Sequence, residues 1–289
     1  MRRIAAAAAV WAAACHPAKV VAPARVPVAA IAPDAGPVDD SAARAEAAWA
    51  RRETDPGAVD QAILLWENAA LHGTDPSVPL LDAARARRTR IARAQRAVDP
   101  DARAIGEDAL ACAADAHRSW AAQFPAAAAQ LDGTHSAAEV YAGVGAPAAE
   151  ALYLEAVCSA AWARMQGFTP LIERRAELTA ALERVIQLAP SLDGGGPERE
   201  LGTLLAALPA YAGGDLAEAR RRLESAAQRA PQDPRNHLAV ARTVAVKAQD
   251  RALFERELAE VKKSDDAMAA ADADALLQRE DDLFGPREK

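Results

Sequence analysis

The sequence is poor in aromatic residues, in cysteine and in long apolar runs, and each shortage limits what the protein is. Aromatic residues make up 4% of the chain against 51% for all hydrophobic residues, because alanine dominates the hydrophobic set. Alanine is the best helix former and a poor strand former, so we expect an all-α fold of closely packed helices. Past the N-terminal stretch, no uncharged apolar run is long enough to span a bilayer.

The charge and the length set further limits. A net charge of −7 argues against a nucleic-acid partner. The chain after residue 40 is long enough to bury roughly 70–75% of its unfolded surface, so a stable core needs neither a metal nor a disulfide.

The first residues are typical of an export signal. Arg2 and Arg3 precede an apolar run over residues 4–14, and that run ends in small alanines directly before Cys15. We therefore predict a lipoprotein signal peptide over residues 1–14, with Cys15 acylated as the first residue of the mature protein. The same alanines also suit ordinary secretory cleavage, which would give a soluble secreted product.

Residues 15–40 predict a tether. Alanine, valine and proline dominate this segment, and its prolines recur every four to six residues. Proline at that density denies a helix its amide donors and favours extended backbone, so we expect a semi-rigid spacer between a membrane and the body at residues 41–285.

The body carries a repeated pattern. Residues 213–231 show a glycine, then small and apolar residues at helical spacing, then a proline, as in the second helix of a tetratricopeptide repeat. These positions are Gly214, Ala219, Leu223, Ala226 and Pro231. The glycine permits a tight turn, the alanine allows two helices to approach closely, and the proline ends the helix.

The same phase recurs near the start of the body, with a partner helix expected over residues 41–52. Its positions are Gly57, Ala62, Trp66 and Ala69. Fainter copies lie over residues 178–190 and 250–261. We predict three or four helical hairpins stacked as a superhelix, a solenoid whose concave surface is the default binding site.

Longer strings resemble a known family. Residues 182–231 contain, in order, a glycine-rich turn, Leu201-Gly202, Leu208-Pro209 and Gly213-Gly214-Asp215, and the helices over residues 249–284 follow at matching spacing. This order resembles the T component of tripartite ATP-independent periplasmic (TRAP) transporters, the TatT family. The resemblance covers roughly residues 41–284.

The resemblance implies a tetratricopeptide-like accessory protein that is exported, lipid-anchored and not an enzyme. It implies a ligand chamber without cofactors that works beside a periplasmic solute-binding P component, with self-association open. The expected location is the periplasmic side of the envelope, at the outer membrane. The alternative is a generic scaffold lipoprotein for protein–protein interactions in the envelope.

The sequence offers little catalytic chemistry. Its five histidines are scattered, without the helical spacing that places two metal ligands on one face, and no phosphate-binding or nucleophile motif is present. We predict no catalytic residue and no metal site.

Four residues are candidates for a pairing or a site. Cys112 and Cys158 lie in alanine-rich helical windows, and an oxidising compartment would let them pair; buried free thiols are the alternative. Tyr153 and Trp162 are candidate walls of an apolar cleft formed by residues 153–231, with simple core packing as the alternative.

Six arginines gather in one helical window, at Arg85, Arg87, Arg88, Arg90, Arg93 and Arg96. Their spacing spreads them around most of the helix, which predicts a solvated face. An anionic partner or a lipid headgroup surface is the alternative.

Acylation of Cys15 is directly testable. Cells fed a clickable palmitate should label the wild-type protein and not Cys15→Ser, because the thiol is the only acceptor that the signal presents. Equal labelling of both, or labelling of neither, would contradict the prediction.

Overall fold

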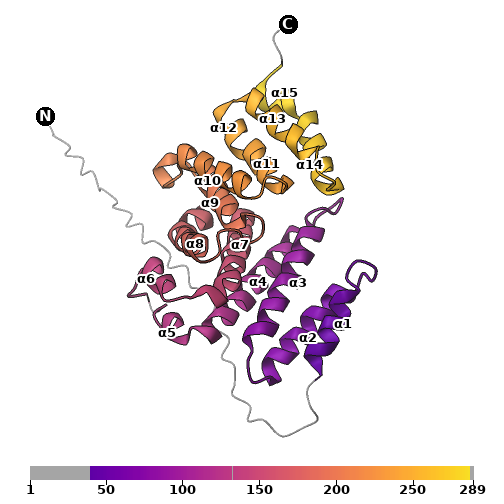
Figure 1. Cartoon of the computed structure of the whole chain (residues 1–289), viewed down its shortest axis with the longest axis vertical. Coiled ribbons are helices and arrows are strands. Elements are labelled where there is room, and N and C mark those ends of the chain that lie inside the picture. Colours follow the sequence, from indigo (N-terminus) through magenta and orange to yellow (C-terminus); the bar gives the residue numbers. More distant parts are fainter. Residues whose placement is uncertain (1–39, 132, 287–289) are drawn as a thin grey trace, which may run out of the picture. The chain divides into compact units, whose positions relative to one another are not determined.

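The computed structural model describes residues 40–131 and 133–286, and within them every regular element is a helix (Figure 1). The predicted all-α fold is therefore confirmed. The predicted signal peptide, Cys15 and nearly all of the tether lie outside the described residues. Within the described residues, no helix combines the length and the apolar character needed to cross a membrane.

The first hairpin consists of α1 (Ser41–Ala50) and α2 (Ala58–His72). The rings of Trp49 and Trp66 lie against each other with centroids 5.8 Å apart, and Trp66 is buried. Ala62, the predicted close-contact position, is fully buried. The helix partner predicted over residues 41–52 is thus present and packs as the spacing indicates.

A larger central group follows, built from α3 (Ser77–Ala94), α4 (Ala102–Gln123), α7 (Ala149–Gln166) and α8 (Phe168–Leu188). In chain order, α4 packs on α3 and on α7, and α7 packs on α8. Short helices α5 (Pro125–Ala128), α6 (Ala137–Ala142) and η1 (Ala146–Ala148) connect α4 to α7. Four consecutive buried residues of α7, residues 151–154, show that this helix is covered on several sides.

Helices α9 (Gly196–Ala207) and α10 (Leu216–Arg229) form the hairpin that the repeat predicted most strongly, joined by η2 (Ala210–Ala212). Ala219, Leu223 and Ala226 are all fully buried. The turn needs its glycine, because a Cβ on Gly214 would lie 1.9 Å from the carbonyl oxygen of Leu208. A Cβ on Gly202 of α9 would lie 3.0 Å from the carbonyl oxygen of Ala219, so the two helices are in close contact.

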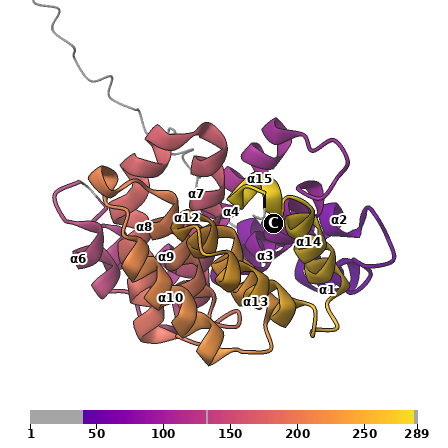
Figure 2. The same cartoon turned by 90° about the horizontal axis from the view of Figure 1, so that it is seen from above.

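The C-terminal helices share a separate apolar cluster around Phe254 and Leu258. They are α11 (Pro234–Val240), α12 (Val246–Ala248), α13 (Arg251–Val261), α14 (Ala267–Gln278) and α15 (Glu280–Phe284), with a π-helical turn, η3 (Ala241–Ala245), between α11 and α12. Helices α11 and α13 pack together, and α13 and α14 pack in turn. Helix α9 packs on α8 and on α10, and both views show it between them (Figures 1 and 2).

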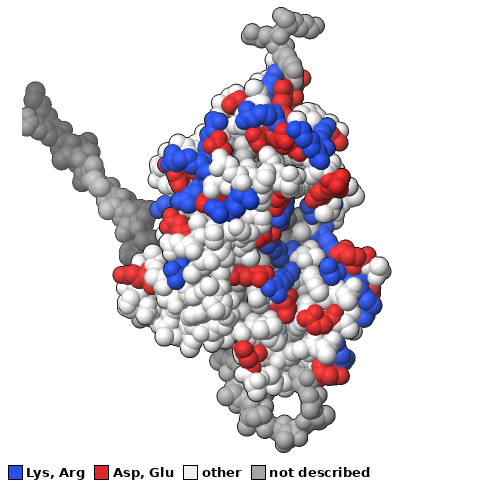
Figure 3. Space-filling view, viewed as in Figure 1, with Lys and Arg blue, Asp and Glu red and all other residues white. Residues whose placement is uncertain are grey.

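The contacts are consistent with a series of hairpins at α1–α2, α7–α8, α9–α10 and α11–α13. The repeat pattern did not predict the α3–α4 pair, which lies between the first and second of these. Charged side chains of both signs mix over the C-terminal helices, whereas few lie over α5 and α6 (Figure 3).

The phase of α10 gives a matched pair of variants. Ala219→Leu should lower the free energy of unfolding by about 1–3 kcal/mol, because the larger side chain overpacks the contact with α9. Ala217 lies on the exposed face of the same helix, so Ala217→Leu should be nearly neutral. Urea unfolding of the two variants checks this, and equal midpoints would contradict the assigned phase.

Candidate functional site

A hollow of about 340 Å³ lies between the N-terminal half of α4 and the C-terminal end of α7. Its lining residues are Ala102, Arg103, Gly106, Glu107, Leu110, Trp162, Met165 and Gln166. The walls are mainly apolar, and the volume is at the lower end of the range for small-molecule pockets. Arg103 and Glu107 form an exposed ion pair with each other at the rim, 2.8 Å apart.

The sequence creates this hollow by omitting a side chain. Gly106 is buried within α4, yet a Cβ built on it would meet only the amide nitrogen of Gln166, at 3.9 Å. A long side chain at this position would fill the space in front of α7. A glycine inside an alanine-rich helix is the sequence signal for this hollow.

Trp162 forms one wall, as predicted for a cleft residue. The guanidinium carbon of Arg174, from α8, lies 5.0 Å from the centroid of its ring, a cation–π contact that holds the indole in place. Half of the hollow comes from α4, however, which precedes the segment 153–231 that we expected to line the cleft.

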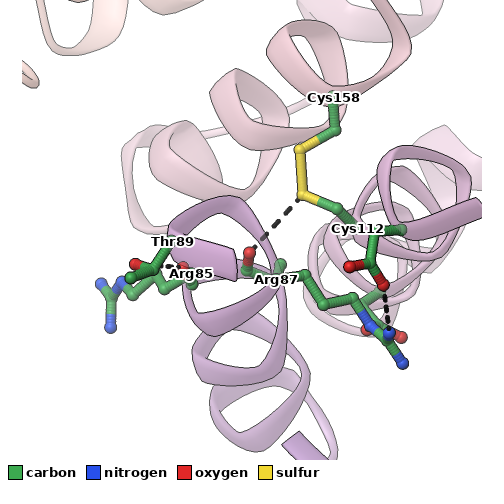
Figure 4. The surroundings of a disulfide bond; sticks show 8 residues. Arg85, Arg87, Thr89, Cys112 and Cys158 are labelled. Carbon is green, nitrogen blue, oxygen red and sulfur yellow. Dashed lines mark hydrogen bonds and ion pairs between the residues drawn. A yellow bond between two sulfur atoms is a disulfide. The ribbon is translucent and has the colours of Figure 1, made fainter. Parts of the chain in front are cut away.

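A disulfide joins α4 to α7 close to the hollow. Cys112 and Cys158 are bonded, with their Cα atoms 5.9 Å apart, and both residues are buried (Figure 4). Arg87 of α3 extends beside Cys112 toward Asp115 of α4 (Figure 4). The bond fixes the separation of the two helices that form the hollow.

Tyr153 does not line this hollow. Its ring is 1% exposed and its hydroxyl donates to the carboxylate of Asp193 at 2.8 Å. Arg88 lies over the ring, with its guanidinium carbon 5.3 Å from the centroid. The structure therefore separates Tyr153 from Trp162 and places Tyr153 in a network of buried polar groups.

Asp193 is the centre of that network, which we call the Asp193 hub. Its carboxylate accepts from Arg88 of α3 at 2.8 Å, from Arg199 of α9 at 3.0 Å and from Arg235 of α11 at 2.8 Å. Together with Tyr153 of α7, these contacts join four helices to one turn.

The turn that carries Asp193 has left-handed backbone. Asp193, Gly194 and Gly195 have φ values of 50°, 64° and 81°. Aspartate tolerates this region better than most residues, and glycine adopts it freely. A Cβ on Gly196, the next residue, would lie 2.4 Å from the hydroxyl of Tyr153, so the glycines also allow the turn to press against α7.

Asn236 of α11 also belongs to the Asp193 hub and binds the backbone of its turn. It is fully buried, and its amide nitrogen donates to the carbonyl oxygens of Gly194 and Ala226, each at 3.0 Å. Its side-chain oxygen accepts from Arg199 at 2.9 Å. The buried polar atoms of the hub thereby satisfy one another.

The hub perturbs the ionisation of Asp193. Burial acts to raise the pKa of Asp193, but the charges of Arg88, Arg235 and Arg199 outweigh it and hold the pKa well below its usual range. Asp193 is therefore ionised at neutral pH, and it contributes as a charge.

The arginines of α3 form a solvated face only in part: Arg85, Arg93 and Arg96 are exposed, whereas the other three are partly buried and bound to neighbouring helices. Arg87 is bound to Glu67 of α2 and to Asp115 of α4, and Arg90 binds Asp60 and Asp108 of the same two helices. Further ion pairs of this helix are Arg85 with Glu150, Arg88 with Asp193 and Arg93 with Glu53. Spacing around α3 did not reveal them, because neighbouring helices on several sides carry the carboxylates.

A second hollow, of about 220 Å³, lies between α11 and α13. His237 lines it, with Nδ1 2.8 Å from the carboxylate of Glu257 and Nε2 3.2 Å from the carbonyl oxygen of Pro231. Both partners are acceptors, so the charged imidazolium fits the site best. The hydrogen bond to Glu257 raises the pKa of His237 accordingly. This histidine joins two helices.

No group of three or more histidine, cysteine, aspartate or glutamate side chains in the described part of the chain is arranged to hold a metal ion.

The fold and the hollow define an all-α helical-hairpin protein with a small apolar depression on its surface. The TRAP transporter T-component family matches residues 79–284, which is most of the chain, and the protein belongs to this family. T components are accessory parts of TRAP transporters on the periplasmic side, and they are not an enzyme family. No curated protein matches the chain closely enough to count as a relative.

The match begins within α3, so the first hairpin, α1–α2, precedes it. All residues that line the two hollows lie inside the matched range, as do the residues of the Asp193 hub and the disulfide. The family resemblance is thereby confirmed over residues 79–284.

The hub predicts a charge-specific loss of stability. Asparagine tolerates left-handed backbone as aspartate does, but it carries no charge. Asp193→Asn should therefore lower the free energy of unfolding by about 3 kcal/mol, because three guanidiniums lose their shared partner. The control, Asp265→Asn, changes an exposed residue and should have little effect.

The effect of Asp193→Asn should depend on pH with a known sign. An aspartate whose pKa is lower in the folded chain than in the unfolded chain stabilises the fold above its unfolded pKa, about 3.9. This stabilisation is lost as the pH falls toward the pKa of the folded chain. The difference between wild type and variant should thus be full at pH 7 and shrink below about pH 4. A difference that is constant across urea titrations at both pH values would refute the charge argument.

Proposed function

We propose that this protein is the lipid-anchored ligand-chamber component of a TRAP-type solute uptake system. In this role it works beside a periplasmic solute-binding protein, to which it binds and with which it exchanges a small solute. The observation that carries the proposal is the family match over residues 79–284. The hollow at Trp162, which lies inside that range, supports a role in binding.

The anchor in this proposal is the lipid on Cys15, and the membrane is the outer one. The export signal at residues 1–14 and the proline-rich tether support this placement. The tether would let the body reach a soluble partner while the lipid holds the protein at the envelope. No catalytic role is proposed, because binding and release of a solute require only shape, apolar area and a few polar atoms.

The hollow is better suited to weak, reversible binding of a solute than to tight binding. It is open to solvent, its polar groups lie at the rim, and the Arg103–Glu107 pair is exposed. A solute held there would be partly covered by α4 and α7 and would need a second surface to bury the rest. A solute-binding protein docked over the hollow would supply that surface.

Gly106 provides the test. Gly106→Leu should fill the hollow and lower recovery of a TRAP solute-binding protein from the native cells by on the order of tenfold in co-purification, as blocking a contact pocket does. Folding should not suffer, because leucine is a better helix former than glycine and the site has room for it.

Gly106→Ala is the matched control, because it makes the same backbone change without filling the hollow. It should retain the partner. Equal recovery with both variants would show that the solute-binding protein does not contact the hollow. If the wild-type protein recovers no solute-binding protein at all, the proposed function fails and the general scaffold is favoured.

A further inference from the structure

The residues that line the hollow between α4 and α7 form two facing rows. Ala102, Gly106 and Leu110 follow one another at intervals of four along α4, and Trp162 and Gln166 have the same spacing on α7. Residues four apart lie on the same face of a helix. The hollow is therefore a slot between two rows of side chains, and Gly106 lies at the middle of one row.

Gly106 leaves the centre of this slot open. The nearest atom to the position of a Cβ there is the side-chain amide nitrogen of Gln166, at 3.9 Å. Gln166 is exposed, and its amide offers both donors and an acceptor to a bound molecule. A compound that lies over Gly106 thus has a hydrogen-bonding partner within reach, and that partner carries no charge.

The Trp162 ring is the largest apolar group of the hollow. Arg174 lies over this ring but does not line the hollow, so it covers a part of the indole that the hollow does not use. Aromatic rings attract one another in offset-stacked and in edge-to-face arrangements, beyond the effect of buried area. The thioether of Met165, which also lines the hollow, makes favourable contacts with aromatic rings. The walls therefore favour an aromatic compound over an aliphatic one of the same size.

The same walls disfavour a charged compound. A cation at Trp162 would lie close to the guanidinium of Arg174, which already uses the negative potential of the ring. An anion would leave water for apolar walls, and the arginine at the rim, Arg103, is paired with Glu107. An uncharged compound avoids both costs.

The volume of the hollow sets the size of the compound. An apolar cavity of about 150 Å³ is large enough to hold benzene. The hollow of about 340 Å³ therefore accommodates one aromatic ring with a short substituent.

We propose that the hollow between α4 and α7 binds an uncharged, planar aromatic compound with a small amide-like substituent. The ring lies over Gly106 against Trp162 and Met165, and the substituent exchanges hydrogen bonds with the Gln166 amide. The inference rests on the proposed function for the premise that the protein binds a solute, and it names the chemical class of that solute.

Titration of the purified full chain with benzamide, followed by saturation-transfer NMR of the compound, tests the proposal. Binding should saturate with a dissociation constant on the order of 1 mM, because the open hollow covers only part of a small compound. Cyclohexanecarboxamide has the same amide on a ring that is not aromatic, and it should bind several-fold more weakly. Benzylammonium and benzoate should also bind more weakly, because each brings a charge to the hollow.

Three variants locate the compound. Gly106→Leu should abolish saturable binding of benzamide by filling the hollow, and Gly106→Ala should retain it, because a Cβ has room there. Trp162→Leu should weaken benzamide several-fold and change cyclohexanecarboxamide little, because only the aromatic compound loses a ring contact. A purely structural role of Trp162 would instead weaken both compounds alike.

Absence of saturable benzamide binding, equal binding of benzylammonium or benzoate, or full binding by Gly106→Leu would each overturn the proposal. An unchanged preference for benzamide over cyclohexanecarboxamide in Trp162→Leu would do the same. The titration uses this chain alone. If benzamide fails to bind while recovery of the solute-binding protein still depends on Gly106, the class of solute is wrong and the proposed function stands.

Discussion

One carboxylate binds helices that lie far apart in the sequence and in two different apolar clusters. The buried apolar residues fall into three clusters, one at the first hairpin, one around α7 and one at the C-terminal helices. Asp193 lies on the turn before α9 and binds guanidiniums from α3, α9 and α11. Because the arginines would repel one another without it, the arrangement of these helices depends on the Asp193 charge.

The same principle operates along α3. Its arginines bind carboxylates on α2, α4 and α7, so this helix is held on several sides by ion pairs in a protein with few large apolar side chains. Alanine packs helices closely but buries little area per residue. Partly buried ion pairs with good geometry fix the relative orientation of helices, which close alanine packing alone does not. Each buried charge in such a pair depends on the presence of the opposite charge.

The sequence predicted the features that depend on neighbours in the chain. The spacing of Ala219, Leu223 and Ala226 identified the buried face of α10, and the glycine at Gly214 identified its turn, because both follow from helix geometry. The role of the α3 arginines was missed, since it depends on carboxylates as much as 105 positions away along the chain. The sequence indicated Tyr153 as a candidate wall of a cleft. Its partner, Asp193, lies 40 residues later, and only the folded chain shows that Tyr153 belongs to the Asp193 hub. The hollow was missed for a related reason: Gly106 marks it only when the end of α7 is known to face it.

The disulfide has a consequence for the unfolded chain as well as for the folded one. Cys112 and Cys158 are 46 residues apart in the sequence, and their Cα atoms lie 5.9 Å apart in the fold. Docking of α4 on α7 holds the two sulfurs within bonding distance, and the bond removes part of the chain entropy that favours unfolding. An oxidised chain that unfolds therefore keeps the two walls of the hollow tied to each other, and it refolds from a smaller set of conformations.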